Sequence, residues 1–387
     1  MRIAGGLRPF RRLLFVGKGK IMAKQPAYAV IYEALLADIR SGKLAAGTML
    51  PPETEIAQIY GVSRITSRRA LLMLAEQGYI CRRPGIGSEV LPMPEKVRTI
   101  GLMMAHISPM FGVGFIQGVM EEARKQGYLV VCQMGYLVPQ QEEQAARDLL
   151  RAGVQGIVMI PLYDATRCSG AFAELPHRVP MVFGDREIIG LDVPLVSTNN
   201  LAATQELCTQ LYQLGHRNIA FVSSSTNSTA VGQRYKGYWE FCEKMGLRPM
   251  TFTDVRSMLP GMSRQSVRVR DVAELVGFLR ENHGITAVVA HTYLVGKLVC
   301  DAIRQLGYEV PRDYSVACFD APSRVDEQEW FTHIRQDEFA MGVRAVQCLT
   351  QQIEGKRVPE TWLVGGRFIE GKSCARVPDW SWDRHRK

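Results

Sequence analysis

The chain has 387 residues, 47% of them hydrophobic, which predicts a globular protein of two or three compact units rather than one core. It contains no apolar run near the ~20 residues of a membrane-spanning helix, and Leu13–Val16 is shorter than the roughly 7–15 apolar residues of a secretory signal, so we expect a cytoplasmic protein that does not contact a membrane. The net charge is +9, and its concentration in the first quarter of the chain favours DNA as a partner.

Residues 1–23 open the chain as a basic arm without sustained hydrophobic periodicity. Residues 1–21 carry six basic and no acidic side chains (+6), residues 22–98 carry ten and seven (+3), and residues 99–387 carry 31 of each. Two interpretations of the arm stay open: it is a disordered segment, or the start is over-extended, because Met22 begins a more ordinary opening.

Residues 24–91 have the pattern of a winged helix-turn-helix domain. A helical repeat of apolar residues begins at Tyr28 and stops at Gly42. Gly61 ends a second, short helix, and Ser63 has the side chain of an N-cap for a third. The expected helices span 28–40, 54–60 and 64–77, and two strands follow at 79–83 and 88–91, joined by a Pro-Gly-Ile-Gly turn.

The third helix has the residue types of a DNA-recognition helix. Such a helix lies in the major groove with its N-terminal residues at the base edges. Arginine binds guanine through two hydrogen bonds, serine and threonine bind phosphates or bases, and a helix N-terminus favours a phosphate. A solvated basic surface is the alternative, but the adjacent wing favours DNA. The predicted DNA-binding residues are Ser63, Arg64, Thr66, Ser67 and Arg68 on the helix, with Arg82, Arg83 and Gly85 on the wing.

A long motif string runs through this domain. It comprises Leu50-Pro51, Glu53-x-Glu55, Tyr60-Gly61-Val62-Ser63-Arg64-x-Thr66, Arg68-x-Ala70-Leu71, Leu74, Gly78 and Gly85-x-Gly87. The string resembles the GntR-type winged helix domain over about residues 27–91. The resemblance implies DNA contacts by Arg64, Thr66, Arg68 and Gly85, with Ser63 beside them.

Three residues depart from that family pattern. Pro52 stands where the family usually has a capping serine, so the helix after it is expected to lack a side-chain N-cap. Thr54 replaces a common arginine or lysine that touches DNA, and Ser67 replaces a usual valine inside the recognition helix. The operator sequence of this chain therefore cannot be inferred from the operators of its relatives.

Residues 92–98 are rich in proline and charge and are expected to form a linker. In residues 99–375, apolar runs alternate with helical stretches, which predicts an α/β fold with parallel sheets flanked by helices, divided into two lobes with a ligand at the strand C-terminal ends. Residues 376–387 are expected to form a tail. The expected strands span 99–105, 128–132, 156–160, 179–183, 218–223, 286–290 and 314–319, and the expected helices span 114–126, 140–151, 201–214, 230–245, 271–282, 294–306 and 337–354.

A second motif set lies in residues 99–375. It comprises Ile100-Gly101-Leu102 with Phe111 and Gly118, Gln155-Gly156-Ile157, Gly184-Asp185-Arg186, Leu214-Gly215-His216-Arg217-Asn218-Ile219-Ala220-Phe221, Arg234 before Gly237-Tyr238, and Phe319-Asp320. The set resembles the sugar-binding domain of LacI/GalR regulators, which is itself akin to periplasmic sugar-binding proteins. A GntR-type head on a LacI-type body is similar to the arabinose-repressor class.

The predicted effector-binding residues lie just beyond strands or at helix starts. Carboxylates accept from sugar hydroxyls, a guanidinium serves neighbouring oxygens, and an aromatic ring covers an apolar sugar face. The alternative is that the acidic residues cap helices or cross-link strands and that the aromatic residue belongs to the core. Where relatives carry Asn-Asp, this chain has His291-Thr292, which indicates an effector different from the common hexoses and pentoses. The predicted set is Phe111, Asp185, Arg234, His291 and Asp320.

These patterns predict a sequence-specific transcription repressor controlled by a sugar-like effector, acting as a homodimer on a pseudo-palindromic double-stranded operator. A ligand-dependent activator is the alternative, followed by a sugar receptor or an enzyme. Gly112-x-Gly114-x-x-x-Gly118 is one residue too long for a dinucleotide loop. We find no catalytic Ser-His-Asp order, and the scattered cysteines (nine in all) have no zinc-like spacing. No enzymatic activity, cofactor or metal is therefore expected.

Overall fold

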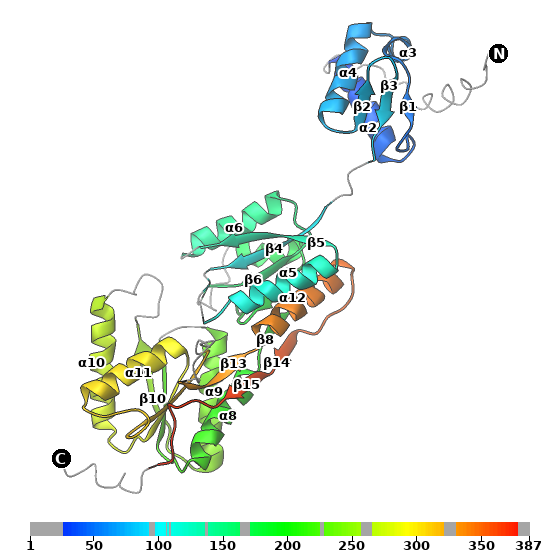
Figure 1. Cartoon of the computed structure of the whole chain (residues 1–387). Helices are drawn as coiled ribbons and strands as arrows, with labels where there is room; N and C mark the ends of the chain where they lie inside the picture. Colours follow the sequence, from blue (N-terminus) through cyan, green and yellow to red (C-terminus); the bar gives the residue numbers. More distant parts are fainter. Residues whose placement is uncertain are drawn as a thin grey trace. The chain divides into compact units, whose positions relative to one another are not determined.

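The computed structural model describes residues 26–92, 97–105, 107, 110–135, 138–162, 171–224, 228–256, 265–320 and 330–377. These residues form two compact units, which divide between Val97 and Arg98 (Figure 1). The predicted arm at 1–23 lies outside the described residues, as do residues 93–96 of the predicted linker and residues 378–387 of the predicted tail. Within the described part of the chain, no helix is long and apolar enough to cross a membrane.

The N-terminal unit contains the predicted helices and wing. Its helices are α2 (Ala27–Arg40), α3 (Glu53–Tyr60) and α4 (Arg64–Glu76), and its strands are β1 (Met49–Leu50), β2 (Ile80–Arg83) and β3 (Gly87–Val90). The strands pair antiparallel in the order β1-β3-β2. The two-residue strand β1 is not predicted by any sequence pattern. The three helices share one core, which includes Ile31, Leu35, Ile56, Leu71 and Leu74.

Local chemistry explains where the helices of this unit begin and end. Gly61 ends α3 in the left-handed region, at φ +65°, which glycine adopts without steric cost. Ser63 accepts a hydrogen bond from the backbone N–H of Thr66 at 3.2 Å and so caps α4, as predicted. Pro52 precedes α3 without a side-chain cap, which confirms the expected consequence of its departure from the family pattern.

The C-terminal unit consists of two lobes, each built on a six-stranded sheet (Figure 1). The first sheet has the order β14-β8-β7-β6-β4-β5 and the second has the order β10-β9-β11-β12-β13-β15. All pairings are parallel except that of β13 with β15. This arrangement confirms the predicted two-lobed α/β fold.

The elements of the C-terminal unit have the following bounds. The strands are β4 (Arg98–Met104), β5 (Tyr128–Met134), β6 (Ile157–Ile160), β7 (Met181–Gly184), β8 (Leu195–Thr198), β9 (Ile219–Ser224), β10 (Met250–Val255), β11 (Ala287–Ala290), β12 (Ser315–Phe319), β13 (Thr332–Gln336), β14 (Thr361–Val364) and β15 (Gly366–Ile369). The helices are α5 (Val113–Lys125), α6 (Pro139–Arg151), α7 (Ala171–Arg178), α8 (Asn200–Gln213), α9 (Thr229–Met245), α10 (Gln265–Glu281), α11 (Tyr293–Gln305) and α12 (Glu338–Ile353).

Several elements differ from the prediction. The strands β8, β10, β13, β14 and β15 and the helix α7 are not predicted, and α10 begins at Gln265 rather than at residue 271. The missed strands mix polar and apolar residues, or are edge strands such as β10 and β14, so they lack the continuous apolar run of a central parallel strand. Arg98, assigned to the linker, is the first residue of β4 and pairs with Tyr128. Val377, assigned to the tail, still donates its N–H to Leu214.

The chain crosses between the two lobes at three described positions. They are Asn199 between β8 and α8, Asp337 between β13 and α12, and Gly365 between β14 and β15. Neighbouring crossings are tied together, because Asn199 donates its N–H to Val364 at 2.8 Å. A hinge of this kind lets the lobes move while the sheets stay intact.

Helices α5 and α12 lie side by side on the first lobe (Figure 1) and share a hydrophobic cluster with its sheet. Their contact depends on two glycines. A Cβ atom on Gly118 would lie 2.2 Å from the carbonyl oxygen of Phe339, and one on Gly342 would lie 2.2 Å from that of Phe115. The two helix backbones therefore approach too closely for any larger residue at these positions.

Candidate DNA-binding surface and effector site

The N-terminal turn of α4 presents most of the predicted DNA contacts. The hydroxyls of Ser63 and Thr66 are hydrogen-bonded to each other at 2.8 Å, beside the cap. Arg64 is largely exposed, and no acidic residue occurs in this first turn. The positive end of the helix dipole and an arginine therefore face solvent together, which suits a phosphate.

Glu53 on α3 links the recognition helix to the wing. Its carboxylate accepts from Nε of Arg64 at 3.2 Å and from the guanidinium of Arg82 at 2.5 Å. Burial disfavours the charged carboxylate, but the hydrogen bonds from the two arginines outweigh it and hold the pKa of Glu53 below its ordinary value. One ionised carboxylate thus fixes two predicted DNA contacts in position.

The remaining predicted DNA contacts fall into two groups. Arg68 and Gly85 are exposed, and Arg83 is exposed beside Glu89 at 3.5 Å. Gly85 has φ +75°, so the tip of the wing needs a residue without a side chain. Ser67 differs, because it is fully buried and donates to the carbonyl of Glu53 at 2.7 Å. The prediction that Ser67 contacts DNA is therefore wrong: its hydroxyl ties α4 to α3.

Among the residues predicted to bind the effector, Arg234 of α9 is buried and held on three sides. Its Nε donates to Oδ1 of Asn200 at 2.7 Å, and its Nη1 donates to the carbonyl of His291 at 2.6 Å. The guanidinium lies 3.9 Å from the ring centroid of Phe319. Burial lowers the pKa of Arg234, and the charge of Asp320 opposes that shift. The arginine is therefore fixed in orientation before any ligand arrives.

Asp320 follows β12 in a left-handed conformation, at φ +56°. Its carboxylate accepts from the side-chain amide of Gln336 at 2.6 Å and from the backbone N–H of the same residue at 3.3 Å. Burial raises the pKa of Asp320 to about 7, against the opposing effect of Arg234. Gln336 also accepts from the hydroxyl of Thr198 at 2.7 Å, so Asp320 is connected through Gln336 to the crossing that follows β8.

Asp185 occupies the equivalent place after β7, also left-handed, at φ +62°. It is buried, and its carboxylate lies 3.4 Å from Nη1 of Arg186. Arg186 in turn donates from Nε to the carbonyl of Pro161 at 2.9 Å. A non-glycine residue with positive φ stores backbone strain, which is concentrated at functional sites. Both strained aspartates stand at C-terminal ends of parallel strands.

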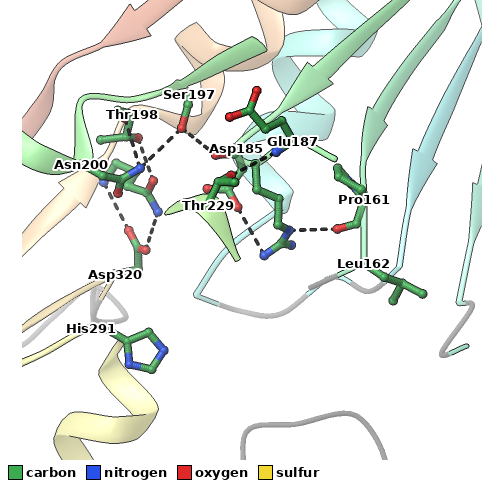
Figure 2. A network of polar contacts seen from close by, with 12 residues as sticks. Pro161, Leu162, Asp185, Glu187, Ser197, Thr198, Asn200, Thr229, His291 and Asp320 are labelled. Carbon is green, nitrogen blue, oxygen red and sulfur yellow. Dashed lines mark hydrogen bonds and ion pairs between the residues drawn. The ribbon is translucent and has the colours of Figure 1, made fainter. Parts of the chain in front are cut away.

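His291 follows β11 and is buried, with 3% of its surface exposed. Its Nε2 is hydrogen-bonded to Oγ of Ser224 at 3.2 Å, whereas Nδ1 has no hydrogen-bond partner among the described residues. Burial, and then the charge of Arg234, lower its pKa to about 3. The ring is thus neutral at physiological pH and has one unused polar atom, a feature that needs an explanation in a buried group. Figure 2 shows His291, Asp320 and Asp185 on the ends of different strands.

The fifth predicted effector residue, Phe111, packs against the core of the first lobe and is partly buried. This packing agrees with the alternative interpretation, in which the aromatic residue belongs to the core. Its contact with a ligand stays a prediction. Sequence reasoning missed Asn200 and Gln336, which hold Arg234 and Asp320. Asn200 follows β8, and Gln336 ends β13. A sequence analysis that predicted these two strands would have pointed to both residues.

The chain matches three family profiles. Residues 27–90 match the gntR family of bacterial regulatory proteins, residues 98–276 match the periplasmic binding proteins and sugar binding domain of LacI family, and residues 208–374 match the periplasmic binding protein-like domain.

Curated relatives and solved structures agree with these matches. The arabinose metabolism transcriptional repressor of Geobacillus stearothermophilus is 26% identical over 343 residues, covering 86% of this chain and 93% of the relative. The transcriptional regulator KdgR of Bacillus subtilis (strain 168) is 25% identical and covers 72% and 81%. Transcription regulator CcpA of Lactococcus lactis has a similar fold, with a TM-score of 0.61 at 18% identity over 72% of this chain and 100% of that chain. The chain is therefore a transcription regulator that joins a gntR-family helix-turn-helix domain to a LacI-type periplasmic-binding-protein-like domain.

Proposed function

We propose that the chain is a repressor whose affinity for its operator is controlled by a small polar ligand, sugar-like in chemistry, bound between the two lobes of the C-terminal unit. The polar cluster formed by Arg234 and His291, which are buried, and by the partly buried Asp320 is the observation that carries the ligand part of this proposal. Removing charged groups from water is costly unless they are paired and hydrogen-bonded, and a cluster of titratable groups with shifted pKa values is typical of a functional site. This cluster adds a neutral imidazole with an unused nitrogen.

The DNA-binding part is assigned to the exposed residues of α4 and the wing. Arg64 and Arg68 read base edges, most favourably guanine. Ser63 and Thr66 stand at the helix N-terminus, where a backbone phosphate is favoured. The wing residues Arg82, Arg83 and Gly85 contact the neighbouring groove or backbone. Each N-terminal unit covers one half-site of the operator, so we propose a homodimer on a pseudo-palindromic operator.

The effector part assigns one chemical role to each polar group. Asp320 and Asp185 accept hydrogen bonds from ligand hydroxyls, and Arg234 donates to neighbouring ligand oxygens. His291 uses Nδ1 toward the ligand, and Phe111 covers an apolar ring face. A ligand that bridges Asp185 of the first lobe and Asp320 of the second favours one lobe arrangement over others, and this differential affinity is what shifts operator binding.

The test begins with selection of operator sequences from random duplex DNA by the full-length chain. A thermal-shift screen against sugars, sugar derivatives and nucleosides then identifies ligands by the rise in apparent stability. We expect a pseudo-palindromic consensus, a dimer on the DNA by analytical ultracentrifugation, and at least one stabilising ligand that changes operator affinity. A monomer on specific DNA, or a consensus without symmetry, would contradict the homodimer proposal.

A further inference from the structure

Ile65 is the most exposed large apolar side chain of the described residues, with 80% of its surface accessible. Single exposed apolar residues are common on protein surfaces, so its position matters more than its exposure. It is the second residue of α4, directly between Arg64 and Thr66. Ile59 on α3 and Leu72 on α4 are considerably less exposed, at 45% and 41%.

The residues around Ile65 are held in place by contacts within the domain, although the Ile65 side chain itself is exposed. The opposite side of α4 is buried through Ala70, Leu71 and Leu74, and Ile65 takes no part in the hydrophobic core of this unit. On either side, Arg64 is bound to Glu53 and Thr66 to Ser63. A β-branched side chain in a helix also has one strongly preferred rotamer. Ile65 is therefore a rigid apolar projection at the N-terminal end of the recognition helix.

Isoleucine has no hydrogen-bonding group, which restricts what it can recognise in a major groove. Most base-edge groups there are donors or acceptors, and covering them with an alkyl side chain leaves them unsatisfied at a cost. The C5-methyl group of thymine is the apolar group that the major groove offers. We propose that Ile65 reads the C5-methyl group of one thymine in each operator half-site. This inference rests on the proposed DNA-binding function and adds one base preference to it.

The test removes only that methyl group. The full-length chain first selects its operator from random duplex DNA, and each thymine of the consensus is then replaced singly by deoxyuridine, which pairs identically but lacks the methyl group. At one thymine per half-site, we expect the replacement to weaken wild-type binding about fourfold, the effect of one buried methyl group. Ile65→Ala should bind the thymine and deoxyuridine operators equally, with unchanged thermal stability because the side chain is exposed.

Ile86→Ala is the matched control, since Ile86 is also an exposed isoleucine, at 68%, but lies on the wing. This variant should keep the fourfold preference for thymine. The inference is overturned if no deoxyuridine replacement weakens wild-type binding, or if Ile65→Ala keeps the preference. Failure of the chain to select any sequence would instead contradict the proposed DNA-binding function, so the two failures are distinguishable.

Discussion

The carboxylate of Glu53 binds the guanidinium of Arg64, with Oε2 3.2 Å from Nε, across the turn that separates the two helices of the helix-turn-helix. The same carboxylate holds Arg82 of the wing. Arg64 is largely exposed, and an ion pair screened by solvent contributes little stability, on the order of 0–1 kcal/mol. Its value lies in orientation, because an arginine held in place loses less side-chain entropy when it binds a base.

Glu53→Gln should therefore lower specificity more than affinity. Removing a negative charge near DNA strengthens binding to any sequence, whereas releasing Arg64 and Arg82 weakens the oriented contacts. We expect the ratio of operator affinity to random-DNA affinity to fall roughly three- to tenfold, about 1 kcal/mol, when measured by fluorescence anisotropy. Glu55→Gln makes the same charge change on the same helix, and its ratio should stay higher than that of Glu53→Gln. Equal ratios for the two variants would contradict the orienting role.

Arg64→Ala and Arg68→Ala should each weaken operator binding by about 1–3 kcal/mol if the arginines read bases. Binding to random DNA should weaken much less. Arg304→Ala, which removes an exposed helical arginine of the C-terminal unit, is the control and should leave operator affinity unchanged. Full operator affinity in both α4 variants would rule out the assignment of the recognition helix.

Effector binding should depend on pH through Asp320, whose pKa burial raises to about 7. An effector that donates hydroxyl groups to the carboxylate favours its ionised form, so its affinity should rise by roughly tenfold between pH 6 and pH 8. Isothermal titration calorimetry at both pH values measures this change, and Asp320→Asn should abolish the dependence. A wild-type affinity that is constant with pH would contradict the role of the carboxylate. The same raised pKa affects folding. Asp320 contributes stability to the folded state that is fully present below the ordinary carboxyl pKa and is lost as the pH rises through about 7.

His291 should make the protein less stable in mild acid. Its pKa is lowered to about 3 in the folded state, so the unfolded chain binds a proton first as the pH falls below about 6.5. Between pH 7 and pH 5 this group alone costs roughly 2 kcal/mol of stability. Chemical denaturation should show a smaller loss for His291→Gln than for the wild type. His177→Gln, at an exposed histidine of α7, should behave as the wild type, and equal losses in all three proteins would contradict the prediction.

Strong local signals made the winged helix predictable from sequence. Gly61 and Ser63 mark a helix end and a helix start by mechanisms that need no tertiary information. Ser67 shows the limit: a polar residue on a basic helix looks exposed in sequence, but the structure turns its hydroxyl toward the Glu53 carbonyl of the preceding helix. Which side of a short helix faces the core depends on packing that the sequence pattern of α4 does not determine.

The residues of the candidate effector site also divide into those that the sequence predicts and those that it does not. Asp185 and Asp320 could be placed because each follows a short apolar run that reads as a buried parallel strand. Asn200 and Gln336 could not be placed, because their strands β8 and β13 mix polar and apolar residues (Leu-Val-Ser-Thr and Thr-His-Ile-Arg-Gln). Both residues act through hydrogen bonds between segments far apart in sequence, Asn200 with Arg234 and Gln336 with Thr198, and no local pattern reveals such a contact.

The most direct test of ligand control measures operator affinity with and without a ligand that the thermal-shift screen identifies. For the wild-type chain we predict a change in operator affinity of at least about fivefold, the lower end of typical allosteric coupling. For Asp320→Ala we predict unchanged operator affinity without ligand and no response to it. For Asp301→Ala, at a partly exposed aspartate on α11, we predict a full response. A ligand that raises the thermal stability of the wild type but leaves its operator affinity unchanged would contradict the proposed function.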